Sequence, residues 1–148
     1  MATLRMLHGS LAAAGAAGGM IAAIIPPGEA AVSPGLFAAI VLADAAVSLG
    51  MLLWARRRPL DTTSPAALAS SYRSLYVMSL GVSFAPTMVG FIGAILTGRA
   101  WVGLLGVGFA LAGLGYLAPR TDVARRQTEI TASGSSLSLE SALDGRGE

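Results

Sequence analysis

Residues Pro34 to Arg58 read PGLFAAIVLADAAVSLGMLLWARRR, an apolar run that ends at three arginines and carries Asp44 near its centre. A helix needs about 20 mainly apolar residues to cross about 30 Å of hydrocarbon, so this run is long enough. The whole chain of 148 residues has the same character, because 54% of it is hydrophobic and 12% is charged. Soluble domains carry roughly 25% charged residues, so the composition predicts a membrane protein.

Four segments have the length and composition of membrane spans, at about residues 7–25, 35–54, 75–96 and 101–117. They lack the apolar-polar alternation of barrel strands, and helices satisfy their own backbone groups in lipid. We therefore expect an all-α, polytopic protein with four transmembrane helices in two antiparallel hairpins over residues 1–118. Ser64 and Pro65 are good first residues for a longer third helix. The polar tail, residues 119–148, is predicted to be largely flexible, with a short helix from Thr121 or Asp122 and one more helical turn at SLESAL (138–143).

The placement of arginine predicts the orientation, because cytoplasmic flanks retain positive charge. All ten basic residues are arginines, and with both termini inside only Arg99 lies on the outer side. The sequence therefore predicts a multi-pass protein of the plasma (inner) membrane with both termini cytoplasmic. The alternative for the first segment is a signal peptide over Met1–Ala30, cleaved after Gly28-Glu29-Ala30.

Small residues predict how the helices pack, because close backbone approach holds helices together in lipid. Gly15 and Gly19 form a GxxxG pair in the first segment, and the fourth segment has Gly106 and Gly113 on one face. The first segment also has a stripe of small residues, Ala12, Ala16, Gly19 and Ala23, with the same spacing as a stripe in the second segment, Ala39, Ala43, Ala46 and Gly50. The matched spacing predicts that the first two helices pair along these stripes; the alternative is that the stripes only reflect a chain rich in Ala and Gly.

Asp44 is the one acidic residue at the centre of a span, where insertion costs roughly 2.5 to 3.5 kcal/mol. Pro86 is expected at the same depth in the third helix, where it kinks the helix and frees the carbonyl of Val82. Ser83 and Thr87 share its face. One interpretation is a structural hydrogen bond from protonated Asp44 to helix three, and the other is a proton or cation site made of Asp44, Ser83 and Thr87.

No other pattern in the sequence indicates chemistry. The chain has no cysteine and a single histidine, His8, without a second ligand at metal spacing, so we expect no metal and no cofactor. The arginines adjoin apolar segments, which indicates contact with the lipid bilayer and not with nucleic acid. We expect a membrane protein without catalytic activity that is a structural or partner subunit, as a homo-oligomer or with another membrane protein. The alternative is a proton- or cation-coupled channel or transporter that uses Asp44.

Two resemblances accompany these patterns. The stretch SLGVSFAPTMVGFIGAILTG (Ser79 to Gly98) resembles the carboxylate-bearing helix of the ATP synthase proteolipid, subunit c, but Phe84 or a neighbour stands where that helix has its acid. The whole chain, with Arg5-Met6-Leu7 and Arg73-Ser74-Leu75 at the entries of two hairpins, is similar to small uncharacterised four-helix bacterial membrane proteins. This second resemblance implies a fold and no activity.

Overall fold

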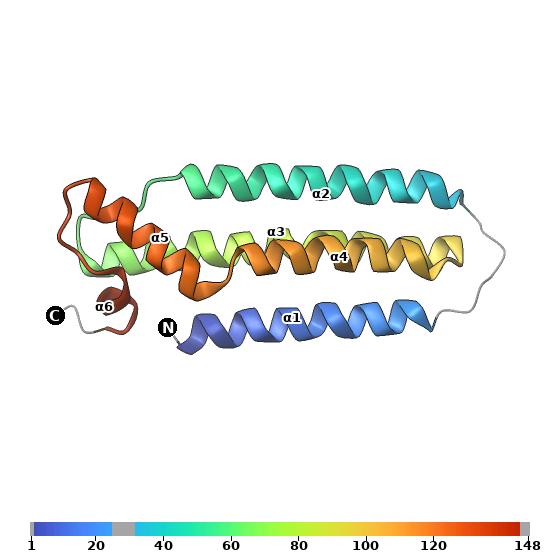
Figure 1. Ribbon diagram of the computed structural model, residues 1–148, viewed down its shortest axis with the longest axis horizontal. Coiled ribbons are helices and arrows are strands. Elements are labelled where there is room, and N and C mark those ends of the chain that lie inside the picture. The colour runs from blue at the N-terminus through green and yellow to red at the C-terminus, as the bar shows by residue number, and fades with distance from the viewer. Residues whose placement is uncertain (1, 25–31, 146–148) are drawn as a thin grey trace.

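The computed structural model shows an elongated helical bundle (Figure 1), and it describes residues 2–24 and 32–145. These residues form six helices and no strand. The helices are α1 (Ala2–Ala23), α2 (Pro34–Arg57), α3 (Pro65–Thr97), α4 (Ala100–Tyr116), α5 (Pro119–Ala132) and α6 (Leu139–Leu143). The proposed cleavage site at Gly28-Glu29-Ala30 lies outside the described residues.

Local sequence signals set the ends of the long helices. Proline occupies the first turn of α2, α3 and α5, where its fixed φ suits a helix and its missing N–H is not needed. Ser64 caps α3 as expected, because its hydroxyl accepts a hydrogen bond from the N–H of Ala67 at 3.1 Å. Gly98 ends α3 in the left-handed conformation, with φ of 59°, a backbone geometry that glycine adopts without strain.

The connection between α2 and α3 carries one local polar turn. Asp61 accepts hydrogen bonds from the hydroxyl of Thr63 at 2.7 Å and from its N–H at 3.0 Å. Both bonds favour the ionised carboxylate, so they lower the pKa of Asp61 below its usual value.

Helices α3 and α4 form the centre of the bundle, and α1 and α2 lie on opposite sides of this pair (Figure 1). Each outer helix contacts both α3 and α4, and the described residues of α1 and α2 make no contact with each other. This arrangement corrects the expectation that the first two helices pack as a hairpin. The small-residue stripes of α1 and α2 have matched spacing, but the glycines of α1 pack against larger side chains of α3 and α4.

Glycines bring α3 and α4 into close contact. A Cβ atom at Gly106 would collide with the carbonyl oxygen of Pro86, and one at Gly90 would lie 3.0 Å from the carbonyl oxygen of Val102. A Cβ at Gly113 would lie 3.0 Å from Oγ of Ser83. The structure therefore places both glycines in this interface, where Gly106 meets the backbone of α3 and Gly113 meets the side chain of Ser83.

The GxxxG pair of α1 is also buried, but against different partners from those expected. A Cβ at Gly15 would meet the rings and side chains of Phe84 and Leu111 at 3.7 and 4.0 Å, and one at Gly19 would lie 3.3 Å from Val107. The two glycines thus allow α1 to approach α3 and α4.

Helix α2 uses the face opposite to its small-residue stripe. Val41, Ser48, Leu52 and Ala55 are buried against the bundle, and Phe37 fills the space beside Gly93 on α3, where a Cβ would lie 2.7 Å from its ring. The stripe itself is exposed at all four positions, Ala39, Ala43, Ala46 and Gly50. At this contact Gly93 on α3 is the small residue and Phe37 on α2 is the large one. The close approach of α2 to α3 therefore does not require the small-residue stripe of α2.

The tail forms α5, where a short helix is expected, and α6. Helix α5 is bent by 47° from α4 and lies across the end of the bundle (Figure 1). In α6, within the predicted SLESAL turn, Leu139 and Leu143 are buried. Gln127 of α5 holds this segment, because its amide donates to the carbonyl of Leu137 and accepts from the N–H of Leu139. Buried leucines and satisfied backbone groups order a stretch whose composition alone is polar.

Two helices, α2 and α3, are long and apolar enough to cross a membrane, and a third span results if α4 and α5 are counted as one bent helix. The apolar helices are those of a membrane protein.

Candidate functional sites

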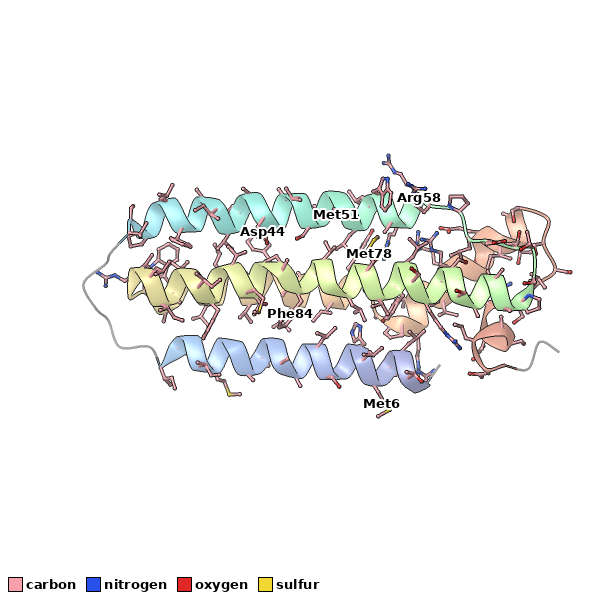
Figure 2. All side chains as sticks on the ribbon, turned by 180° about the vertical axis from the view of Figure 1, so that it is seen from behind. Met6, Asp44, Met51, Arg58, Met78 and Phe84 are labelled. Carbon is pink, nitrogen blue, oxygen red and sulfur yellow. The ribbon has the colours of Figure 1, made fainter. Side chains whose placement is uncertain are left out.

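The first candidate site is the acid in the middle of α2. Asp44 lies between α2 and α3 (Figure 2), half-buried, and its Oδ2 atom is buried without a hydrogen-bond partner. Phe37 on α2 lies against Gly93 on α3, and the two helices run in opposite directions. Asp44 follows Phe37 by the same number of residues by which Pro86 precedes Gly93, so Asp44 lies level with Pro86. The structure thus places the acid at the depth of the proline, as the sequence suggests.

The structure does not bring the two hydroxyls of the predicted site to this acid. Ser83 donates its hydroxyl to the carbonyl of Ser79 at 2.9 Å, on its own helix. The methyl group of Thr87 lies toward Gly18 of α1, where a Cβ would be 3.5 Å away, and its hydroxyl has no hydrogen-bond partner. Phe84 also lies between α3 and α1 (Figure 2). Among the described residues Asp44 therefore has no second ligand, and Ser83 and Thr87 are not gathered around it.

His8, the lone histidine, takes part in a hydrogen-bond chain inside the bundle. Tyr76 donates its hydroxyl to the carbonyl of Leu117 at 3.1 Å, and Nδ1 of His8 lies 3.1 Å from the same hydroxyl. Since the tyrosine proton is used, Nδ1 of His8 is the donor of the second bond. This chain links α1, α3 and the end of α4, which is a structural role.

The second candidate site is a cleft of about 680 Å³ at the end of the bundle that carries α5. It lies between the last turn of α2 with the following loop and the outer side of α5. Five arginines and a single acid are among its lining residues, so its charge is strongly positive. The lining consists of Leu53, Arg56, Arg57, Arg58, Pro59, Leu60, Thr62, Tyr116, Arg125, Arg126, Glu129, Ile130 and Ser133.

Arg126 forms the floor of this basic cleft and ties α5 to α2. It is buried, and its guanidinium donates to the carbonyls of Ala55 at 2.8 Å and Arg58 at 3.1 Å, and to Glu129 at 3.0 Å. The carbonyl of Ala55 also accepts a hydrogen bond from the backbone N–H of Arg58 at 3.3 Å, and the dipole of α2 favours a cation at this end of the helix. Arg126 is therefore fully engaged and holds the cleft in shape.

A second polar contact ties α5 to α3 behind the cleft. Tyr72 donates its hydroxyl to Oδ2 of Asp122 at 3.0 Å, and both side chains are buried. Together with Arg126, this contact fixes α5 against two helices of the bundle.

Other arginines of the cleft keep unused donors. Arg56 lies over the ring of Tyr116, 3.3 Å from its centre, and donates to the carbonyl of the same residue, but its Nε has no partner. Arg125 donates from Nη1 to Glu129, and its Nε and Nη2 have no hydrogen-bond partner although they are buried. Nη2 of Arg125 lies 3.6 Å from Oδ1 of Asp122, so this arginine is shared between the carboxylates of Asp122 and Glu129.

No local pattern in the sequence indicates this cleft. Arg56–Arg58 and Arg125–Arg126 are far apart in the chain, and each group reads as a topology marker beside an apolar segment. Only the bend of 47° between α4 and α5, which lays α5 across the end of the bundle (Figure 1), brings them together. The described residues hold no cluster of three or more His, Cys, Asp or Glu that could bind a metal ion.

The fold and these sites define a class: an all-helical membrane protein with a lone acid in its bundle and a basic cleft at one end. Compared with protein-family models, with curated proteins and with solved structures, the chain matches none of them.

Proposed function

We propose that the protein is an integral membrane subunit without catalytic activity that binds another transmembrane helix through the outer face of α2. The observation that supports this proposal is the one-sided packing of α2. At about 100° per residue, the stripe of Ala39, Ala43, Ala46 and Gly50 lies roughly opposite the buried face of the helix.

The exposed stripe has the form of a helix-packing surface. Ala39 and Ala43, and again Ala46 and Gly50, are small residues four positions apart, the spacing that allows two membrane helices to approach closely. A Cβ at Gly50 would meet nothing within 4 Å, so the space beyond the stripe is open. Lipid chains fill such a surface poorly, whereas a second helix with small residues gains dispersion contacts along its length.

The proposed arrangement in the plasma (inner) membrane has four spans with both termini cytoplasmic. Helices α1, α2 and α3 have 22, 24 and 33 residues and α4 has 17, which covers about 26 Å at 1.5 Å per residue. The N-terminus, α5 and α6 lie at the same end (Figure 1), and the arginine-rich flanks belong to that end. This arrangement agrees with the charge rule for cytoplasmic segments.

Site-specific crosslinking tests the subunit proposal. The chain has no cysteine, so Ala43→Cys introduces a single attachment point for a maleimide–diazirine reagent on native membranes. Leu49→Cys is the matched control, because Leu49 is 54% exposed but lies about a quarter turn from the stripe. We expect Ala43→Cys to give several times more crosslinked protein, and mass spectrometry then shows whether the partner is a second copy or another chain. Equal protein adducts at the two positions, or lipid adducts only, would contradict the proposal.

A second candidate function, proton or cation coupling, depends on the unpaired Oδ2 of Asp44. A carboxyl group buried in a span usually marks a functional position. The test is flux in proteoliposomes driven by a proton or sodium gradient, with Asp44→Asn as the variant that keeps the shape and loses the titration. Absence of flux from folded wild-type protein removes this candidate and leaves the subunit function.

A further inference from the structure

We propose that the basic cleft between α2 and α5 binds the headgroup of an anionic phospholipid, and that the acyl chain of this lipid lies in an apolar groove between α2 and α4. The proposal requires only that the chain resides in a bilayer. It does not rest on the partner helix proposed for the outer face of α2, although Ala46 of that stripe also lines the groove.

The charge of the cleft selects an anion. Arg56, Arg57, Arg58 and Arg125 surround a space with one carboxylate, that of Glu129, and the fifth arginine, Arg126, is engaged by carbonyls. Guanidinium groups bind phosphate oxygens through pairs of parallel N–H groups. Because the cleft has few carboxylates, these N–H groups are not all occupied by acidic side chains. The volume of about 680 Å³ is within the range of sites that hold small molecules, roughly 300 to 1,000 Å³.

The exposed arginines locate the phosphate within the cleft. Arg57 and Arg58 line the cleft and are exposed, whereas Nε of Arg56 and both Nε and Nη2 of Arg125 are buried, and Nη2 of Arg125 lies 3.6 Å from Oδ1 of Asp122. A phosphate in the cleft would accept hydrogen bonds from Arg57 and Arg58 and would neutralise part of the repulsion among the arginines around it.

The apolar groove continues from the cleft along the bundle, and this continuity favours a lipid over a free anion. Tyr116 lines both spaces, and the groove of about 420 Å³ runs along Leu42, Leu49 and Leu52 of α2 and Phe109 and Ala112 of α4. A ligand that occupies both spaces has a negative head and an apolar chain.

The aromatic residues place this junction at headgroup depth. Trp54 and Tyr116 are 47% and 43% exposed, as expected for side chains at a membrane–water boundary. Arg58, which lines the cleft, lies over the ring of Trp54, 4.3 Å from its centre, and Arg56 lies over the ring of Tyr116. An anionic phospholipid would meet the arginines without leaving its own leaflet.

Native mass spectrometry of the full chain in neutral detergent tests this proposal, with phosphatidylglycerol, phosphatidylcholine of the same acyl chains, and inorganic phosphate as ligands. We expect tighter binding of phosphatidylglycerol, and a loss of about fivefold in its affinity for each of Arg57→Gln and Arg125→Gln, the effect of one basic residue near anionic lipid. Arg120→Gln is the matched control, because Arg120 is on α5 but does not line the cleft. Arg57 is exposed, so its variant keeps the fold.

The groove has its own variant pair. Ala112→Trp fills the groove and should weaken phosphatidylglycerol binding, whereas Leu104→Trp, on an exposed part of α4 outside the groove, should not. Equal binding of the two lipids, or an equal effect of Arg120→Gln and Arg57→Gln, would overturn the proposal. Full competition by inorganic phosphate with no effect of Ala112→Trp would also overturn it, because the ligand would then be a free anion.

Discussion

The interface between α3 and α4 permits a sharp prediction at Gly106. Replacing Gly106 with alanine puts a methyl group onto the carbonyl oxygen of Pro86, with the Cα of Gly90 only 3.1 Å away. Both obstacles are backbone atoms, so no side-chain rotation relieves the overlap. Overpacking of this kind costs about 1 to 3 kcal/mol or more, and the better helix propensity of alanine offsets roughly 1 kcal/mol. We expect Gly106→Ala to lower the free energy of unfolding by about 2 kcal/mol.

Gly108 supplies the matched control on the same helix. A Cβ at this position meets nothing within 4 Å, so Gly108→Ala carries the propensity gain without the overlap and should stabilise by up to about 1 kcal/mol. The assay is unfolding in mixed detergent–SDS micelles followed by far-ultraviolet circular dichroism. From the overpacking cost and the helix propensity together, we expect the free energies of unfolding of Gly106→Ala and Gly108→Ala to differ by about 3 kcal/mol. Equal free energies of unfolding would refute the close backbone contact between α3 and α4.

Two further predictions concern the outer elements. Gly19→Leu should destabilise the bundle by about 2 kcal/mol in the same assay, because the glycine is buried against α4. Ala43→Leu should change stability by less than about 0.5 kcal/mol because its position is exposed, and a cost equal to that of Gly19→Leu would instead favour a packed α1–α2 pair. Arg126→Met should release α5 and speed amide hydrogen exchange over residues 119–132 by about tenfold or more, since two carbonyls of α2 lose a charged donor. Arg120→Met should leave that exchange unchanged, and fast exchange in both variants would show that α5 is not held by Arg126.

The sequence determined the helices because their formation depends on local properties. Four apolar runs became the helices α1 to α4, of which α2 and α3 are long and apolar enough to cross a membrane. Proline at the start of α2 and α3 set their first turns. Ser64 is a polar cap that acts within four residues, so its role was readable before the fold was known. The depth of Asp44 relative to Pro86 also followed from counting residues along two antiparallel helices.

Tertiary structure decided which faces pack. Glycine and alanine are frequent throughout the chain, so small-residue stripes occur on several helices and spacing alone cannot select among them. The face that packs is the one that meets a complementary surface on a neighbouring helix. For α1 this surface contains Phe84 and Val107, whereas α2 packs by placing Phe37 beside Gly93 of α3. The basic cleft likewise required the bend of 47° before α5, because arginines separated by about 70 residues share no local signal. Helix formation and capping depend on residues that are neighbours in the chain. Helix packing and charge clusters depend on which distant segments meet in the folded protein.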